Sequence, residues 1–198
     1  MKLYYAPGAC SLAPHIVIRE AGLPADLVKV DLRAKKLEDG SDYLAINGKG
    51  AVPALGLDAD EVLTENAAVM QYLADLSGND TLLPPSGIRR YRVLEWLIYV
   101  TTELHEGYGP LWNPASADDL KQATREMLAK KFTYVEGKLG ENEYLTGTEF
   151  TVADAYLFVM LRWSAHHGVD IGPGLTAYRD RVAARPAVAK ALEEEGLS

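Results

Sequence analysis

The feature that most constrains the fold is a change of pattern at Leu82–Gly87, a segment with two prolines and a glycine. Before it, short runs of β-branched and aromatic residues alternate with helical patterns, whereas every periodic stretch after it has helical spacing. Because proline and glycine interrupt regular structure, the segment is typical of a linker. A chain of 198 residues has room for two small domains. We predict an α/β domain over residues 1–80, a linker over 81–87 and an all-α domain over 88–198.

The first domain is expected to open with a strand-helix-strand unit. A strand at Leu3–Tyr5 stops at the turn Pro7-Gly8, a helix follows from about Ser11 to Ala21, and Leu27–Val30 alternates as a second strand. Two strands joined by a helix pair in parallel, and ligands bind at the carboxyl ends of such strands. The residues that follow the first strand are therefore the first place to look for a site.

The only cysteine, Cys10, lies at this edge, just before the predicted helix. Unpaired backbone N–H groups and the positive end of the helix dipole favour a thiolate there, which predicts a lowered pKa and a reactive thiol. The competing interpretation is a small buried hydrophobe, a common fate of free cysteine. A single cysteine also excludes an intramolecular disulfide and a dithiol redox motif.

A hairpin is predicted next, from strands at Ala54–Leu57 and Val62–Leu63 around the turn Asp58-Ala59-Asp60. Pro53 cannot donate to a sheet ladder, so it must begin a strand or lie on an edge. The bond from Val52 to Pro53 stays open on sequence alone: trans simply starts a strand, while cis turns the Val52 backbone outward, where an extended peptide could pair with it.

The helix after this hairpin begins near Glu65 and Asn66 and ends at Gly78-Asn79. Asn66 is a good N-cap residue, which is the structural explanation of this pair. The functional alternative is that Glu65 faces a ligand ammonium while the helix start holds a carboxylate. A short helix is also expected around residues 41–46.

Helices are predicted in the second half at residues 88–111, 117–139, 151–167, 174–184 and 186–194. Thr151 and Asp154 form a capping box, so Asp154→Ala is expected to cost about 1 kcal/mol of stability. The apolar residues from Tyr156 to Leu161 make this helix the buried axis of the domain. His105 lies off the apolar stripe of its helix, either as a solvated residue or as part of a site.

The net charge of −8 argues against binding to nucleic acid. One basic cluster, Arg33 with Lys35 and Lys36, departs from this balance, and is either a solvated loop or a local anion-binding patch. The longest apolar run, Ala155–Leu161, is too short to cross a bilayer, and the first residues have strand pattern. We expect a cytoplasmic protein that does not enter membranes.

Together these pieces resemble the cytosolic glutathione transferases. The resemblance rests on the Val52-Pro53 dipeptide, Glu65-Asn66, the Thr151 to Asp154 capping box and the order of the two domains. The opening residues 1–12, with Glu103-Leu104-His105, resemble the bacterial beta class in particular. The resemblance implies a thioredoxin-like N-terminal domain that binds glutathione, an all-α domain with the electrophile pocket, a homodimer, and no metal.

It also implies roles for matching residues. The implied catalytic residues are Cys10, His105 and Ser11, with Tyr5 in support. Lys35 would bind the glycine carboxylate of glutathione, and Val52 with a cis Pro53 would bind its cysteinyl unit. Glu65 and Asn66 would bind the γ-glutamyl end. Glu103 would approach from the partner subunit. The electrophile pocket falls to Tyr108, Trp112 and Trp163, near His105.

The function expected from this resemblance is conjugation of glutathione to apolar or aromatic electrophiles, with thiol-disulfide exchange or peroxide reduction through Cys10 as a variant. The alternative is a non-catalytic protein on the same fold that binds ligands or the transcription machinery. Three residues depart from the class pattern: Asn66, Ile98 and Glu106. They are expected to alter the polar contacts to glutathione.

Overall fold

A computed structural model describes residues 1–58 and 61–197 of the chain. The chain divides into two compact units, Met1–Leu83 with Arg185–Ser198, and Pro84–Ala184. The closing segment is where the structure differs from the predicted division at 88–198. Its helix packs against the first helix of the chain, and an ion pair between Arg185 and Glu20 (2.7 Å) strengthens that contact.

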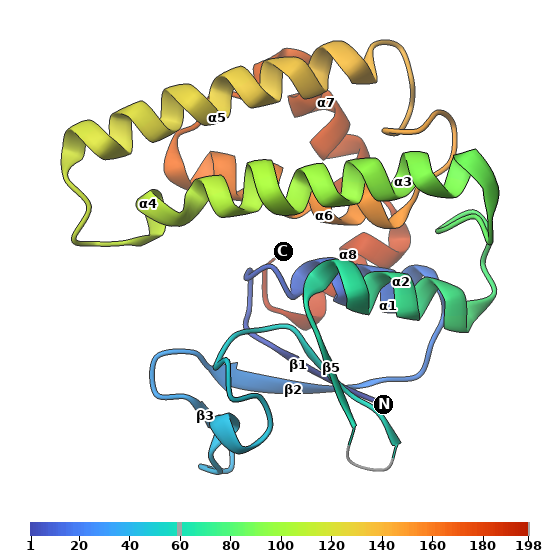
Figure 1. Cartoon of the computed structure of the whole chain (residues 1–198), viewed down its shortest axis with the longest axis vertical. Helices are drawn as coiled ribbons and strands as arrows, with labels where there is room; N and C mark the ends of the chain where they lie inside the picture. The colour runs from blue at the N-terminus through green and yellow to red at the C-terminus, as the bar shows by residue number, and fades with distance from the viewer. Residues whose placement is uncertain (59–60, 198) are drawn as a thin grey trace. The chain divides into compact units, whose positions relative to one another are not determined.

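The first unit is a five-stranded sheet of order β3-β2-β1-β4-β5, with helices α1 and α2 on one face (Figure 1). The predicted parallel pair is confirmed between β1 and β2, and the predicted hairpin between β4 and β5 is antiparallel. The middle of the predicted hairpin turn, Ala59 and Asp60, lies outside the described residues. The elements of this unit are β1 (Lys2–Tyr5), α1 (Leu12–Glu20), β2 (Asp26–Asp31), β3 (Lys36–Leu37), the 3₁₀ helix η1 (Tyr43–Ala45), β4 (Ala54–Gly56), β5 (Val62–Thr64), α2 (Asn66–Ser77) and α8 (Pro186–Glu194).

The apolar faces of these elements make the core of the first unit. Leu3 of β1, Ile16 of α1 and Met70 of α2 are fully buried where the helices meet the sheet. A second cluster, around Tyr43 and Val52, packs on the opposite face of the sheet. Apolar packing on both faces therefore holds the sheet to which the candidate site residues are attached.

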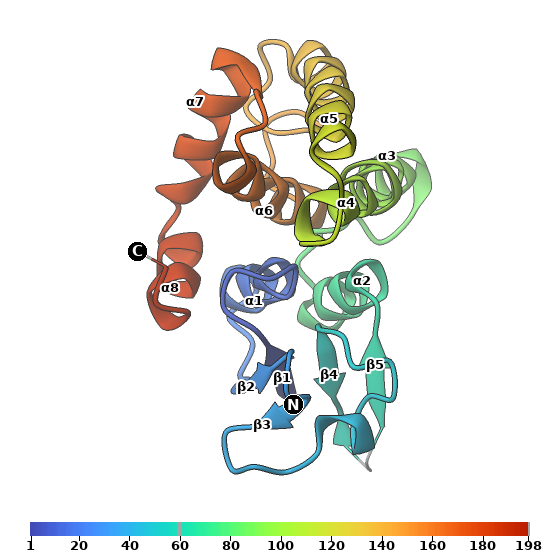
Figure 2. The same cartoon turned by 90° about the vertical axis from the view of Figure 1, so that its left-hand side faces the viewer.

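The second unit consists of helices, as predicted, with α6 at its centre (Figure 2). Every side chain from Val152 to Leu161 is buried, which confirms the predicted buried axis. Among the described residues, none of its helices has both the length and the apolar character that crossing a bilayer demands. The elements of this unit are α3 (Gly87–Tyr99), the π-helical segment η3 (Val100–His105), the 3₁₀ helix η4 (Glu106–Tyr108), α4 (Gly109–Trp112), α5 (Asp118–Leu139), α6 (Val152–His167) and α7 (Gly172–Ala183).

The predicted helix over 88–111 does not keep α-helical spacing to its end. Thr101 Oγ1 donates to Leu97 O (2.8 Å) and Thr102 Oγ1 donates to Ile98 O (3.1 Å), four residues back. Hydroxyls that bond these carbonyls compete with the backbone N–H groups that an α-helix would place there. The chain widens into the π-helical turn of η3 at this point, and such turns are often found at functional sites.

The predicted capping box at the start of α6 is confirmed, but Asp154 does more than cap. Its carboxylate is fully buried and accepts hydrogen bonds from Thr151 N and Oγ1, from Leu145 N (2.8 Å) and from the Tyr178 hydroxyl (2.7 Å). We therefore expect its removal to cost more than the ~1 kcal/mol of a cap, because truncation leaves donors from three segments unpaired.

Candidate active site

Cys10 lies in the turn between β1 and α1, two residues before the helix begins. The residue is half-buried, and its thiol Sγ donates to Val52 O at 3.1 Å. Burial raises the pKa of the Cys10 thiol to about 12, although backbone N–H groups and the Asn66 amide act in the opposite direction. The predicted lowering of this pKa is wrong, because desolvation of the thiolate outweighs the helix start. The thiol is a neutral donor at neutral pH.

Ser11 and Tyr5 hold the structure around this turn. Ser11 is fully buried, and its hydroxyl accepts from Ala6 N (3.2 Å) and donates to Ala6 O (3.3 Å), which ties the end of β1 to α1. Tyr5 is also buried, and this burial raises its pKa. Both placements favour support of the turn over contact with a substrate.

The peptide bond from Val52 to Pro53 is cis, which resolves the question left open by the sequence. Val52 is buried, and its carbonyl oxygen accepts a hydrogen bond from the Cys10 thiol. The preceding carbonyl, Ala51 O, accepts from the Tyr43 hydroxyl and from Asn47 Nδ2, each at 2.8 Å. Tertiary contacts therefore hold the two residues that precede Pro53 in one conformation.

Two lysines lie close to this loop. Lys35 has a positive φ of 55°, and its Nζ donates to Gly50 O at 2.6 Å. Lys49 was missed by the sequence reasoning, which treated Gly48–Gly50 only as a turn. Its Nζ contacts Glu65 Oε1 at 2.5 Å and Thr64 Oγ1 at 2.8 Å. Two cations thus lie within reach of the Val52 backbone loop.

Glu65 and Asn66 begin α2, but not in the predicted arrangement. Glu65 takes the N-cap position with a φ of 71° and makes no side-chain cap, so the prediction of Asn66 as N-cap is wrong. Asn66 is instead the first helical residue and is 6% exposed. Its amide lies beside Cys10, where it acts to lower the pKa of that thiol, while its buried Oδ1 has no hydrogen-bond partner among the described atoms. A buried acceptor without a donor is rare and is a place where a ligand N–H can bind.

The two predicted polar residues of the second unit both lie on η3. Burial lowers the pKa of His105, whose Nδ1 is hydrogen-bonded to the Tyr156 hydroxyl. Glu103 is paired with Lys131 Nζ, which lies 2.7 Å from Oε2 and 2.9 Å from the Glu103 carbonyl. The structure therefore gives Glu103 a partner from α5 in its own chain.

The residues predicted for the electrophile pocket form an aromatic cluster. The Trp163 ring is 5.4 Å from Tyr108 and 5.2 Å from Trp112, each edge to face. Tyr108 is fully buried: its hydroxyl donates to Met160 O (2.9 Å), and its ring packs against Trp163. Trp112 is 49% exposed and stacks on His166, a histidine that the sequence reasoning missed.

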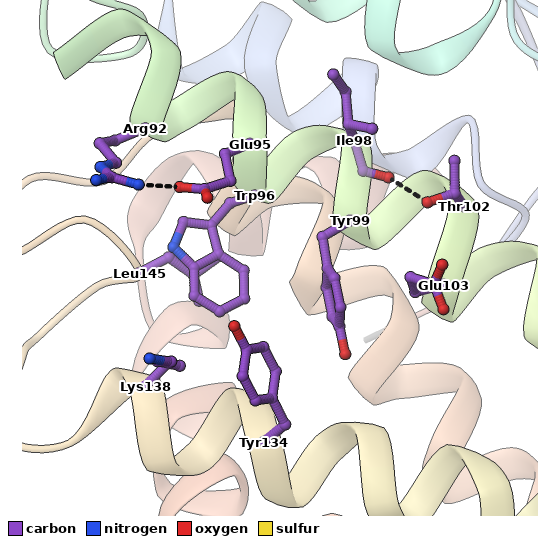
Figure 3. Close-up of a pocket in the computed structure, with 10 residues that line it drawn as sticks. All are labelled: Arg92, Glu95, Trp96, Ile98, Tyr99, Thr102, Glu103, Tyr134, Lys138 and Leu145. Carbon is purple, nitrogen blue, oxygen red and sulfur yellow. Dashed lines mark hydrogen bonds and ion pairs between the residues drawn. The ribbon is translucent and has the colours of Figure 1, made fainter. Parts of the chain in front are cut away.

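A cavity of about 620 Å³ lies elsewhere in the second unit, between α3 and α5 (Figure 3). It is lined by Trp96, Tyr99 and Tyr134, with Arg92 and Lys138 at its polar edge. Of the predicted site residues, only Glu103 lines it. Within the described part of the chain, no three His, Cys, Asp or Glu side chains form a group suited to a metal ion.

The chain matches two family models, "Glutathione S-transferase, N-terminal domain" over residues 8–76 and "Glutathione S-transferase, C-terminal domain" over residues 96–186. It is 48% identical to the glutathione S-transferase GstA of Escherichia coli O157:H7, with both chains covered completely.

Two solved structures are similar over the full length of both chains. One is the beta class glutathione S-transferase of Sphingomonas chungbukensis, with 46% identity and a TM-score of 0.95. The other is a sphingomonad glutathione S-transferase complexed with glutathione, with 44% identity and a TM-score of 0.94. The chain therefore belongs to the glutathione S-transferase family, and a bacterial beta class member is among its similar solved structures.

Proposed function

We propose that this protein conjugates the thiol of glutathione to apolar or aromatic electrophiles. The observation that carries the proposal is the grouping in the first unit of a thiol, a backbone loop and a buried amide. The Cys10 thiol donates to Val52 O, and the Asn66 amide lies beside Cys10 with its Oδ1 unpartnered. Lys35 and the Lys49–Glu65 pair add charges of both signs at the same loop. This set suits a short peptide that carries an ammonium and carboxylates.

Each part of glutathione has a complementary group in this unit. Its ammonium fits the Glu65 carboxylate, its γ-glutamyl carboxylate fits the start of α2, and the unpartnered Asn66 Oδ1 is free to accept an N–H from the ligand. The cysteinyl unit fits along the Val52 backbone, and the glycine carboxylate fits Lys35. The sphingomonad relative complexed with glutathione supports this choice of ligand.

The chemistry of the proposal places the reacting charge on glutathione. The glutathione thiol loses its proton to solvent water, and hydrogen-bond donors stabilise the thiolate. The sulfur then forms a bond to the electrophilic carbon, and the leaving group departs with its electron pair. His105 keeps its catalytic role in this proposal, and Trp112, Trp163 and the Tyr108 ring keep theirs in holding an apolar electrophile. Glu103 is retained as a residue that contacts the partner subunit's glutathione.

Cys10 has a smaller part in the proposal than its position first suggested. Thiol-disulfide exchange requires a thiolate, and a thiol with a pKa of about 12 supplies very little at neutral pH. Exchange and peroxide reduction through Cys10 are therefore secondary activities. A non-catalytic binding protein is not favoured.

The test is retention on immobilised glutathione with release by free glutathione, followed by turnover of an activated chloronitrobenzene. Asn66→Ala should raise the Kd for glutathione about tenfold, since a hydrogen bond to a buried amide is lost. Asn142→Ala, an exposed site, is the matched control and should leave the Kd unchanged. Failure of the wild-type protein to be retained contradicts the proposal, and retention without turnover identifies a binding protein instead.

A homodimer in the cytoplasm, where it serves in detoxification, completes the proposal. Three apolar side chains stand more than half exposed on α3, Ile88, Tyr91 and Ile98, and Tyr134 of α5 is 50% exposed. An exposed apolar face of this kind is typical of a subunit interface. Sedimentation should give twice the mass of the chain, and Tyr91→Glu should shift the protein toward monomer, whereas the exposed Leu120→Glu should not.

A further inference from the structure

His105 is held in place by a residue that the sequence offers only as part of an apolar run. Tyr156 lies on α6, its residue surface is fully buried, and its hydroxyl is hydrogen-bonded to His105 Nδ1. Resting on the catalytic role proposed for His105, we propose that Tyr156 is its positioning residue. Its phenolic hydroxyl donates to Nδ1, which keeps the ring proton on Nε2 and makes the imidazole a hydrogen-bond donor.

The direction of this hydrogen bond follows from the protonation of both partners. A phenol keeps its proton at neutral pH, and burial lowers the pKa of His105, which keeps the imidazole neutral. In a neutral imidazole one nitrogen carries the proton and the other accepts. A buried phenolic proton needs an acceptor, and His105 Nδ1 lies within hydrogen-bond distance of the Tyr156 hydroxyl to serve as one.

The ring is also fixed against rotation. Trp163 lies seven residues after Tyr156 on α6, so both side chains point to the same face of that helix. Their rings meet His105 edge to face, with centroids 5.1 Å away for Trp163 and 5.7 Å for Tyr156. One rigid helix thus sets both the tautomer and the plane of the imidazole.

The charged neighbours leave this arrangement intact. Glu106 follows His105 in the chain and raises its pKa, but less than burial lowers it. Glu103, two residues earlier, is paired with Lys131 of α5. A neutral imidazole with its proton on Nε2 stabilises an anionic sulfur, whereas it cannot take up a proton at that atom.

Nuclear magnetic resonance of ¹⁵N-labelled histidine tests the proposal directly. The wild-type protein should show one His105 tautomer, with Nε2 protonated and Nδ1 not. Tyr156→Phe should give a mixture of both tautomers and a raised His105 pKa, because the donor that disfavours protonation of Nδ1 is gone. The kcat of this variant should fall about tenfold, which is the usual effect of removing the residue that orients a functional histidine. Its KM for glutathione should stay unchanged.

Tyr178→Phe is the matched control, since it removes another buried hydroxyl of the second unit, one that bonds Asp154. It should lower stability while keeping the His105 tautomer and the shape of the pH profile. A wild-type Nδ1 proton, or an unchanged tautomer in Tyr156→Phe, overturns the proposal. The wild-type spectrum decides even if the variant fails to fold.

The spectra also separate this proposal from the function on which it rests. If His105→Ala conjugates at the full rate while the wild-type histidine carries its proton on Nε2, His105 has no catalytic role. Tyr156 would then position a ring that the reaction does not use. An Nδ1 proton together with a large loss in His105→Ala would leave the proposed function standing and overturn only the role of Tyr156.

Discussion

Cys10 of the first unit and His105 of the second were predicted as a pair of catalytic residues, and burial acts on them in opposite senses. It raises the pKa of the thiol to about 12 and lowers the pKa of the imidazole. Desolvation disfavours whichever form is charged, which is the thiolate for one group and the imidazolium for the other. Both side chains are therefore neutral at pH 7.

Because both side chains are neutral, neither supplies the negative charge of the proposed reaction. The neutral thiol already donates its one proton to Val52 O, whereas the neutral imidazole that Tyr156 contacts at Nδ1 has an Nε2 proton to donate. The reacting anion is then the sulfur of glutathione, and the protein supplies its surroundings. Variants of the buried groups test this assignment of charge.

The largest effect is expected at a third buried group, Asp154. Burial raises its pKa as it does for Cys10, but donors from Thr151, Leu145 and Tyr178 surround this carboxylate. Asp154→Ala should cost about 3–5 kcal/mol of unfolding free energy, measured by urea titration, since it leaves those buried donors unpaired. Asp180→Ala, at an exposed ion pair, should cost under about 0.5 kcal/mol. A loss near 1 kcal/mol at Asp154 would mean that it acts only as a cap.

The next effect concerns the reactivity of Cys10. At pH 7 its alkylation by iodoacetamide should be about 10²-fold slower than that of an exposed thiol, because the thiolate is scarce. Ala115→Cys in a Cys10→Ala background gives the exposed thiol for comparison. The rate should rise with pH up to at least pH 10. A fast reaction at pH 7 would restore the activated thiol predicted from sequence.

His105 variants test the donor role by activity. His105→Ala should lower kcat for conjugation by at least about tenfold, because a donor to the developing anion is lost. His105→Gln retains an N–H at about the place of Nε2 and should recover much of that loss. Equal losses in both variants would argue for proton uptake by the imidazole in place of donation.

The lowered pKa of His105 also predicts the sign of a stability change. The unfolded chain protonates this histidine near pH 6.5, before the folded protein does, so the unfolded state binds more protons. The stability contributed by His105 should therefore decline as pH falls below about 6.5, until the lower folded pKa is reached. Thermal unfolding of the wild-type protein and His105→Gln from pH 5 to 8 should diverge in that window. Parallel curves would contradict the shift.

Local sequence patterns were enough to predict most of the fold. The parallel pair, the hairpin and the central helix each follow from spacing within a few residues. β3 was missed because two residues, Lys36 and Leu37, are too few to show alternation. The place of α8 was missed because its packing on α1 is a long-range contact that no local pattern contains.

The site could be predicted as residues but not as an electrostatic environment. Cys10 was found from its position before a helix, and the sign of its pKa shift was missed because burial arises from segments far away in sequence. Tyr156 was read as core for the same reason: nothing in an apolar run shows that one hydroxyl meets His105. The side-chain partner of Lys49 is likewise a tertiary contact.

Removing the Cys10 thiol should have the weakest effect on conjugation, and this variant distinguishes the role of Cys10 from that of His105. Cys10→Ala should change kcat for conjugation by less than about threefold, because the backbone N–H groups at the start of α1 remain as donors. The same variant should form no adduct with oxidised glutathione, since it has no other cysteine. Intact mass and initial rates measure both properties on one preparation. A large loss of conjugation would show that the neutral Cys10 thiol is itself a donor that the reaction needs, which would make it the counterpart of His105 in chemistry as well as in burial.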